Sequence, residues 1–151
     1  MKAVLKYPGA KWRISEWIIS HFPEHKVYCE PFFGSGAVFF NKPQTYIETI
    51  NDIDGNIVNL FKVCRDNPEE LARLIEFTPF AREEFENCYD KSDDSLEQAR
   101  RTLVRYHQSF GTSNSSKKSW RNVQTYGGPR TATMWNYLPG RISEIGRASC
   151  R

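Results

Sequence analysis

The chain has 151 residues, 39% hydrophobic and 14% aromatic, which is enough for one domain with a core or for one domain with a small insert. Its formal net charge is +3, and we expect neither a membrane span nor a signal peptide. Four widely spaced cysteines without a Cys-x-x-Cys pair exclude a zinc pattern and a disulfide framework, and reduced thiols fit a cytoplasmic protein.

Positive charge is concentrated in the last third of the chain. Residues 1–100 hold 12 Lys/Arg against 17 Asp/Glu, whereas residues 101–151 hold 9 Lys/Arg and a single acid, Glu144. A basic segment joined to an acidic body predicts a polyanion-binding surface, with nucleic acid as the partner. The alternative is a solvated basic face.

The first predicted elements are a turn and a short helix. Pro8-Gly9 is a turn signal, with Tyr7 before it and Lys11 after it. Apolar residues at helical spacing over positions 14–19 then predict a helix that ends near Pro23.

A glycine-containing segment follows the first predicted strand, residues 26–29. Residues 30–40 read Glu-Pro-Phe-Phe-Gly-Ser-Gly-Ala-Val-Phe-Phe. A strand, a glycine turn and a helix start are the layout by which α/β proteins present a nucleotide-like ligand. Gly34 and Gly36 permit positive φ and a close backbone approach. Phe39 stands at the third glycine position of a dinucleotide fingerprint, and no Gly-Lys-Ser/Thr follows, so an adenosine-type ligand without a pyrophosphate is predicted.

A second strand is predicted over residues 46–50, and it is followed by Asp52. In a βαβ unit the carboxylate after the second strand lies beside the glycine loop, within reach of ribose hydroxyls. We therefore interpret Asp52 as a ribose ligand, with a turn-forming aspartate as the alternative. Asn51 and Asp54 are interpreted as turn and cap residues.

Consecutive helices are predicted from residue 56 onward, over residues 56–65, 67–77, 80–89 and 94–110, with a last short helix capped by Thr133 and ending before Pro139-Gly140. We place a boundary near Arg65, so that residues 1–65 form the cofactor-binding part and residues 66–144 form a helical and basic recognition region.

The segment 111–130 is polar and basic, carries interleaved aromatic residues and lacks helical periodicity. Its basic and aromatic side chains, together with one arginine before it, are candidates for contacts with phosphates or bases: Arg105, Lys117, Lys118, Trp120, Arg121, Tyr126 and Arg130. The alternatives are a flexible loop over residues 111–119 and a core role for Trp120.

Three motifs together resemble the Dam-type adenine-specific DNA methyltransferases. They are Lys-Tyr-Pro-Gly-Ala-Lys at 6–11, the segment 30–40, and Asn-Asp-Ile-Asp at 51–54, in the order of that family. The alanine at position 10, where the family often has a second glycine, is a mild departure. The resemblance implies a Rossmann-like S-adenosylmethionine-dependent methyltransferase fold with a helical DNA-recognition insert. It also implies the cofactor-binding residues Tyr7, Lys11, Glu30, Phe32, Gly34, Gly36 and Asp52.

The implied reaction is methyl transfer from S-adenosylmethionine to the adenine amino nitrogen of duplex DNA, by a metal-independent enzyme for which a monomer is favoured. The implied source is a phage, a mobile element or a restriction–modification system. The family's transfer step needs an Asp-Pro-Pro-Tyr motif that binds the target amine and stacks on a flipped base, and this chain contains no Pro-Pro dipeptide. We therefore expect a front fragment that is inactive alone.

Residues 145–151 resemble an in-frame translation of a sequencing adapter, so the natural sequence is expected to end near Glu144. Two other classes of protein remain as alternatives to a methyltransferase. One is a non-catalytic DNA-binding module with the same fold, and the other is an NAD-dependent oxidoreductase. Phe39 and the basic second half of the chain both count against the oxidoreductase.

Overall fold

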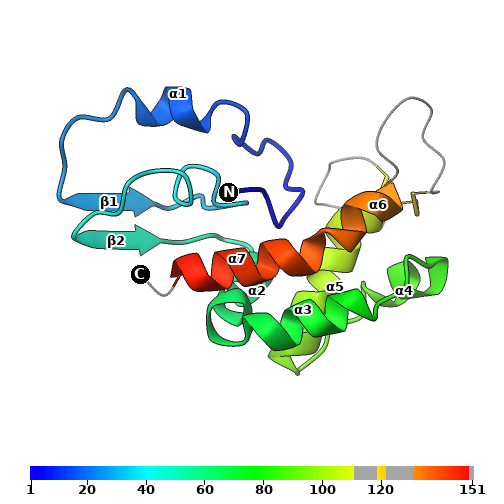
Figure 1. Ribbon diagram of the computed structural model, residues 1–151. Coiled ribbons are helices and arrows are strands. Elements are labelled where there is room, and N and C mark those ends of the chain that lie inside the picture. The colour runs from blue at the N-terminus through cyan, green and yellow to red at the C-terminus, as the bar shows by residue number, and fades with distance from the viewer. Residues whose placement is uncertain (111–118, 122–130, 150–151) are drawn as a thin grey trace.

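A computed structural model describes residues 1–110, 119–121 and 131–149 (Figure 1). A small parallel sheet with a short helix beside it lies next to a layer of helices (Figure 1). The elements are α1 (Ser15–Ile19), β1 (Val27–Glu30), β2 (Ile47–Ile50), α2 (Gly55–Asp66), α3 (Pro68–Glu76), α4 (Arg82–Asn87), α5 (Ser95–Gln108), α6 (Thr131–Asn136) and α7 (Leu138–Ser149).

The sheet consists of the two predicted strands, paired in parallel with Val27 opposite Ile47 and Glu30 opposite Ile50. Parallel neighbours require a crossover connection, and here the glycine segment supplies it. Both arrowheads in Figure 1 point toward the helical layer, so the carboxyl ends of the strands face the helices. The predicted helix start after Gly36 takes the form of successive turns, with the amide of Phe40 donating to the Gly36 carbonyl at 3.0 Å.

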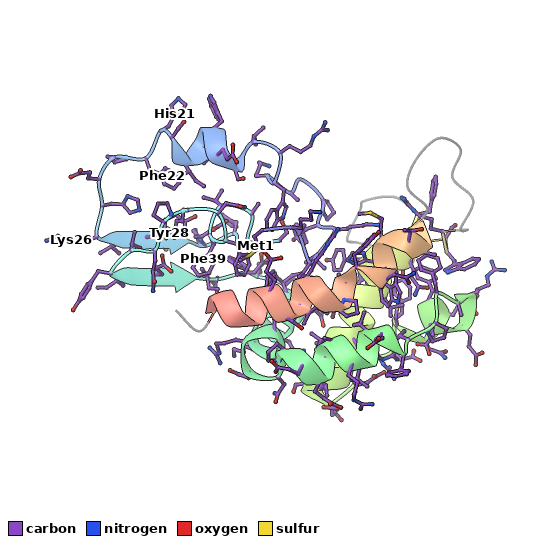
Figure 2. The ribbon with its side chains drawn as sticks, in the orientation of Figure 1. Met1, His21, Phe22, Lys26, Tyr28 and Phe39 are labelled. Carbon is purple, nitrogen blue, oxygen red and sulfur yellow. The ribbon has the colours of Figure 1, made fainter. Side chains whose placement is uncertain are left out.

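Helix α1 is connected to the sheet through aromatic contacts. Phe22, which follows α1, points toward Tyr28 of β1 (Figure 2), and the two ring centroids are 6.0 Å apart. Trp17 on α1 itself is 65% exposed. The segment that contains α1 therefore packs against the sheet through the Phe22 ring, and much of the apolar surface of α1 remains exposed.

Helices α2, α3 and α5 form as their sequence signals predict. The Asp54 carboxylate caps α2 by accepting the Asn56 amide at 2.9 Å, and Pro68 occupies the first turn of α3. The Asp94 carboxylate caps α5 by accepting the amide of Leu96 at 3.1 Å. The apolar stripe of α2 is buried as expected: Ile57, Leu60, Phe61 and Cys64.

The prediction for the last helices was wrong. Thr133 lies inside α6 rather than capping a helix, and Pro139-Gly140 lies in the first turn of α7 rather than ending an element. Proline is tolerated in a first turn because the amide that it lacks has no intrahelical partner there. Packing then favours continuation, since the stripe of Leu138, Ile142 and Ile145 is fully buried. The helix predicted over residues 94–110 was also too long, because α5 ends at Gln108 and Phe110 beyond it is 67% exposed.

The main hydrophobic core joins the chain's first residues to the helical layer. Val4 and Leu5 are buried in the same cluster as Leu103 of α5 and Ile142 of α7. The predicted boundary near Arg65 therefore marks a change in element type within one packed core, and the division into domains stays a prediction. Helix α7 runs past Glu144 to Ser149, and the origin of residues 145–151 also stays a prediction.

His107 fastens α5 to the N-terminal segment. It is fully buried, and its Nε2–H donates to the Val4 carbonyl at 2.7 Å. Burial lowers the pKa of His107 to about 3, with further lowering by the charges of Lys6 and Arg141. The imidazole is therefore neutral in the folded protein, and a proton can enter only at a free-energy cost.

This histidine predicts a loss of stability in acid. Because the pKa of His107 is near 6.5 in the unfolded chain and about 3 in the folded one, its stabilising contribution is complete above pH 6.5 and declines as the pH falls toward 3. The decline approaches about 1.4 kcal/mol of unfolding free energy per pH unit. In urea unfolding measured at pH 7.5 and 5.5, we expect His107→Gln, which keeps an amide donor, to flatten this dependence. The exposed-residue control His25→Gln should retain it, and an unchanged slope in His107→Gln would refute the assignment.

No helix within the described residues is both long and apolar enough to cross a membrane.

Candidate cofactor and nucleic-acid sites

The glycine loop has the backbone that its sequence predicts. Gly34 and Gly36 have φ values of +52° and +66°, in the left-handed region that L side chains rarely adopt. A Cβ on Gly34 would lie 2.9 Å from the Tyr7 ring, and one on Gly36 would lie 2.5 Å from Phe33 and from Phe40. Both positions therefore require glycine for conformation and for space.

Backbone hydrogen bonds join this loop to the end of β2. The Asn51 amide donates to the Glu30 carbonyl at 3.0 Å, and the Phe33 amide donates to the Asn51 carbonyl at 2.9 Å. The ladder of the sheet thus continues one step beyond the strands. It fixes the first residues of the loop against the residues that follow β2.

Asp52 lies beside the glycine loop, as the spacing predicts. Its Oδ2 accepts the Gly34 amide at 2.7 Å, and its Oδ1 accepts the Asp54 amide at 3.0 Å. Each carboxylate oxygen has a second lone pair, so both can accept a further hydrogen bond. The carboxylate is oriented by two backbone amides and retains capacity for hydroxyl donors.

The segment around Tyr7 lies against the same loop. The Tyr7 ring covers Gly34, and the Trp12 indole N–H donates to the Ser35 hydroxyl at 3.0 Å. The exposed Lys11 ammonium donates to the Gly9 carbonyl at 2.6 Å and has two further donors to offer. The structure therefore brings the first two motifs together, and Trp12 is a contact that the sequence reasoning missed.

Glu30 and Phe32, also predicted to bind the cofactor, differ in their surroundings. Glu30 is half-buried, where its carboxylate accepts the Tyr28 hydroxyl at 2.8 Å and the backbone amide of Phe39. Burial raises the pKa of Glu30, although these hydrogen bonds oppose the rise. Phe32 is 85% exposed beside the loop. Glu30 thus supports the loop from inside, whereas Phe32 offers a free aromatic surface.

An apolar cavity of about 390 Å³ opens next to Asp52. It extends along β2 between the turns after the glycine loop and helix α2. Its walls are largely aromatic and aliphatic and include Phe33, Phe39, Phe40, Ile50, Ile57 and Phe61. The polar and charged residues of its lining are Glu48, Asn51, Asp52, Lys62 and Arg65, and among them Asp52 is hydrogen-bonded to the glycine loop. An oriented carboxylate beside apolar walls suits a ligand that combines hydroxyl groups with a flat ring.

Tyr106 of α5 adds an unexpected group to this region. Its ring centroid is 5.8 Å from that of Tyr7, and its buried hydroxyl has no hydrogen-bond partner among the described residues. Burial raises the pKa of Tyr106, and the nearby charge of Asp54 adds to the rise. Tyr106 lies within the helix predicted over residues 94–110, but helical periodicity carries no information about the surroundings of a hydroxyl.

Only part of the predicted DNA-binding set lies within the described residues. Arg121 is held by an amide hydrogen bond to the Gln108 carbonyl at 2.7 Å, and its buried Nε has no partner among those residues. The Arg105 guanidinium lies 5.3 Å from the Tyr89 ring centroid.

Trp120 packs against Phe80, with ring centroids 6.0 Å apart, and its indole N–H donates to Gln108 at 3.3 Å, a position that favours the core alternative. The remaining candidates lie outside the described residues: Lys117, Lys118, Tyr126 and Arg130.

Lys6 lies near two other cations, Arg121 and Arg141. Arg141 of α7 donates to the Ala3 carbonyl at 3.0 Å, and the half-buried Lys6 is close enough to Arg121 and Arg141 for their charges to act on it. Burial lowers the pKa of Lys6, and the two arginines lower it further. None of the three forms an ion pair within the described residues. The sequence supplies no acid between residues 98 and 143, so that stretch contains no carboxylate to neutralise the cluster.

Lys6 opens the first motif, in which the sequence assigned a role only to Tyr7 and Lys11. Arg141, in contrast, had no signal, because the helix that carries it was expected to end earlier. Within the described part of the chain, no group of three His, Cys, Asp or Glu side chains is placed to hold a metal ion.

Comparisons with known proteins agree with the arrangement of motifs. A family model described as D12 class N6 adenine-specific DNA methyltransferase matches residues 7–132. The chain is 34% identical over 74 residues to a DNA N-6-adenine-methyltransferase of Escherichia phage P1, which covers 48% of this chain and 10% of the phage protein. It is 34% identical over 77 residues to the type II methyltransferase M1.LlaDCHI of Lactococcus lactis subsp. cremoris, covering 50% of this chain and 26% of that enzyme.

A third relative is a DNA adenine methylase of Salmonella typhi, 30% identical over 101 residues that cover 59% of this chain and 36% of the methylase. The matched stretch is thus between a tenth and little more than a third of the length of these three relatives. The family model, in contrast, covers most of the chain, including all three motifs except Lys6. The chain belongs to the D12 class N6 adenine-specific DNA methyltransferase family.

Proposed function

We propose that this chain binds S-adenosylmethionine and forms part of an enzyme that methylates the adenine amino nitrogen in duplex DNA. The observation that carries the proposal is the 2.7 Å hydrogen bond from the Gly34 amide to Asp52, which unites the glycine loop with the acid after β2. Membership of the methyltransferase family supports the choice of ligand. We further infer that the two-stranded parallel sheet belongs to a Rossmann-like methyltransferase fold.

The residues present fit this cofactor. The left-handed glycines leave room for a ligand against the backbone, and Asp52 retains acceptor capacity for two ribose hydroxyls. Lys11 has donors left for the methionine carboxylate, and the Tyr7 ring forms a wall beside Gly34. When bound, S-adenosylmethionine supplies an electrophilic methyl group. The chain's own residues bind and orient it, and Glu30 supports the loop from within.

Cofactor selectivity tests the proposal. In isothermal titration calorimetry we expect the 151-residue chain to bind S-adenosylmethionine and S-adenosylhomocysteine but not NADH, because Phe39 occupies the position of the third dinucleotide glycine. We also expect no methyl transfer to duplex DNA by this chain alone, since it contains no Asp-Pro-Pro-Tyr sequence. Binding of NADH alone would overturn the proposal, and methyl transfer by the chain would overturn the expected inactivity.

For DNA we propose that the cluster of Lys6, Arg121 and Arg141 contacts phosphates, together with Arg105 and the predicted basic residues of the segment 111–130. Unpaired cations that lie close together repel one another, and a phosphate relieves that repulsion. The buried Arg121 Nε–H has no hydrogen-bond partner among the described residues, and a phosphate oxygen would supply the acceptor that it lacks. Arginine is also suited to phosphate because its donors form a planar fork.

Salt dependence measures this contact. We expect Arg121→Gln to weaken binding of duplex DNA irrespective of sequence and to reduce the slope of log affinity against log salt by about 1, the value for one lost phosphate contact. The matched control is Arg73→Gln on α3, whose arginine is exposed and already paired with Glu70 at 2.7 Å. Equal slopes for wild type and Arg121→Gln would remove Arg121 from the interface.

A further inference from the structure

The hydroxyl of Tyr106 is a buried polar group without a structural role. It has no hydrogen-bond partner among the described residues, although most buried hydroxyl groups in proteins have one. An unsatisfied buried hydroxyl is costly, and a phenylalanine would fill the same space without that cost. The packing of α5 therefore gives no reason for a hydroxyl group at this position.

The position of the ring relates Tyr106 to the proposed cofactor site. Tyr106 packs against Tyr7, with ring centroids 5.8 Å apart and planes inclined by 36°. Tyr7 in turn covers Gly34, whose amide is bound to Asp52. Two aromatic rings thus connect α5 of the helical region to the glycine loop.

Tyr106 also lines a second cavity. It has a volume of about 290 Å³ and is lined by polar groups of α2 and α5, among them Asn56, Gln98, Thr102 and Arg105. Asn56 and Gln98 are hydrogen-bonded to each other at 3.0 Å, and Asn56 Nδ2 donates to Asp54 at 3.0 Å. These polar groups are satisfied by one another, whereas the Tyr106 hydroxyl is not.

We propose that the Tyr106 hydroxyl donates a hydrogen bond to the methionine carboxylate of bound S-adenosylmethionine, so that a helix of the recognition region completes the cofactor pocket. This inference rests on the proposed function. In the proposed site Tyr7 and Lys11 are assigned to the methionine part of the cofactor, and Tyr106 packs against Tyr7. Asp52 is assigned to the ribose.

The chemistry of the hydroxyl suits an acceptor. Burial and the nearby charge of Asp54 raise the pKa of Tyr106, so the group is a protonated donor at neutral pH. A carboxylate is the strongest acceptor on the amino-acid part of the cofactor, and a hydrogen bond to a charged group is about twice as strong as one between neutral groups. The Tyr106 hydroxyl would then have a hydrogen-bond acceptor when S-adenosylmethionine is bound and none among the described residues when the site is free.

The test is the variant Tyr106→Phe, which removes one oxygen atom and keeps the ring. We expect its affinity for S-adenosylmethionine to fall by roughly 10-fold or more, as for the loss of a hydrogen bond to a charged group. Its affinity for 5′-methylthioadenosine, which lacks the amino-acid part, should equal that of wild type. The melting temperature of the ligand-free variant should be unchanged or higher, since a buried unsatisfied hydroxyl has been removed. The matched control is Tyr137→Phe, whose side chain is 60% exposed.

The outcomes separate this inference from the proposed function. If wild type binds no S-adenosylmethionine, the proposed function fails. If wild type and Tyr106→Phe bind it equally well, the role of Tyr106 fails and the proposed function stands. A lower melting temperature with unchanged affinity would show a structural hydroxyl. An equal loss for 5′-methylthioadenosine would overturn the assignment to the methionine end.

Discussion

A Gly36→Ala variant is expected to lose about 2–5 kcal/mol of unfolding free energy, a large part of the stability of an ordinary domain. The left-handed backbone at Gly36, with φ of +66°, costs an L residue about 1–2 kcal/mol. The new Cβ would also lie 2.5 Å from the rings of Phe33 and Phe40, and such overpacking costs about 1–3 kcal/mol. Neither ring can retreat freely, because both pack against Phe61 of α2.

Urea unfolding followed by circular dichroism measures this loss. The matched control is Gly55→Ala at the start of α2, where a Cβ would meet nothing within 4 Å and φ is not positive. That substitution is expected to be neutral or slightly stabilising, because alanine restricts the unfolded chain. A Gly36→Ala protein with the wild-type unfolding midpoint would contradict the described loop conformation.

The second large effect is expected at Asp52. We expect Asp52→Asn to lower the affinity for S-adenosylmethionine roughly 10- to 100-fold, since hydrogen bonds to a charged group contribute about 1.5–3 kcal/mol. Asparagine keeps one carbonyl oxygen for the Gly34 amide, so the loop is expected to retain its shape. What is lost is the second acceptor and the negative charge that we propose hold the ribose hydroxyls. Isothermal titration of both proteins gives the ratio directly.

Asp54→Asn is the control for this experiment. Asp54 is two residues away and caps α2 through the Asn56 amide at 2.9 Å, a role that asparagine fills equally well. The charge removed is the same in the two variants, but only Asp52 is bound to the glycine loop. If both substitutions reduced the affinity equally, a general electrostatic effect would replace the proposed ribose contact.

Local signals were sufficient to predict the elements that position the site. Each strand was marked by a β-branched or aromatic run with a turn after it. The caps Asp54 and Asp94 began α2 and α5, and Pro68 in the first turn began α3, where the sequence indicated. The adjacency of Gly34 and Asp52 also followed from the sequence. Parallel strands end at the same edge of a sheet, so residues that follow each strand are brought together without knowledge of the remaining fold.

The parts that escaped prediction depend on contacts between segments far apart in the chain. Pro139-Gly140 reads as a helix end, yet burial of the stripe that begins at Leu138 outweighs this local preference. The bond from His107 to Val4 and the approach of Arg141 to Lys6 join positions more than 100 residues apart. Tyr106 likewise gained its place beside the glycine loop from the docking of α5, which periodicity alone does not describe.

Hydrogen–deuterium exchange of the chain with and without S-adenosylmethionine tests the central claim most directly, because it locates the ligand on the backbone. We expect added cofactor to slow exchange in two peptides, one spanning the glycine loop at 30–37 and the other spanning Asp52 at 51–56, where backbone and carboxylate form one hydrogen-bonded unit. The peptide that covers α4, none of whose residues is assigned to the site, should exchange unchanged. Protection confined to other segments, or no protection at saturating cofactor, would contradict the site described here.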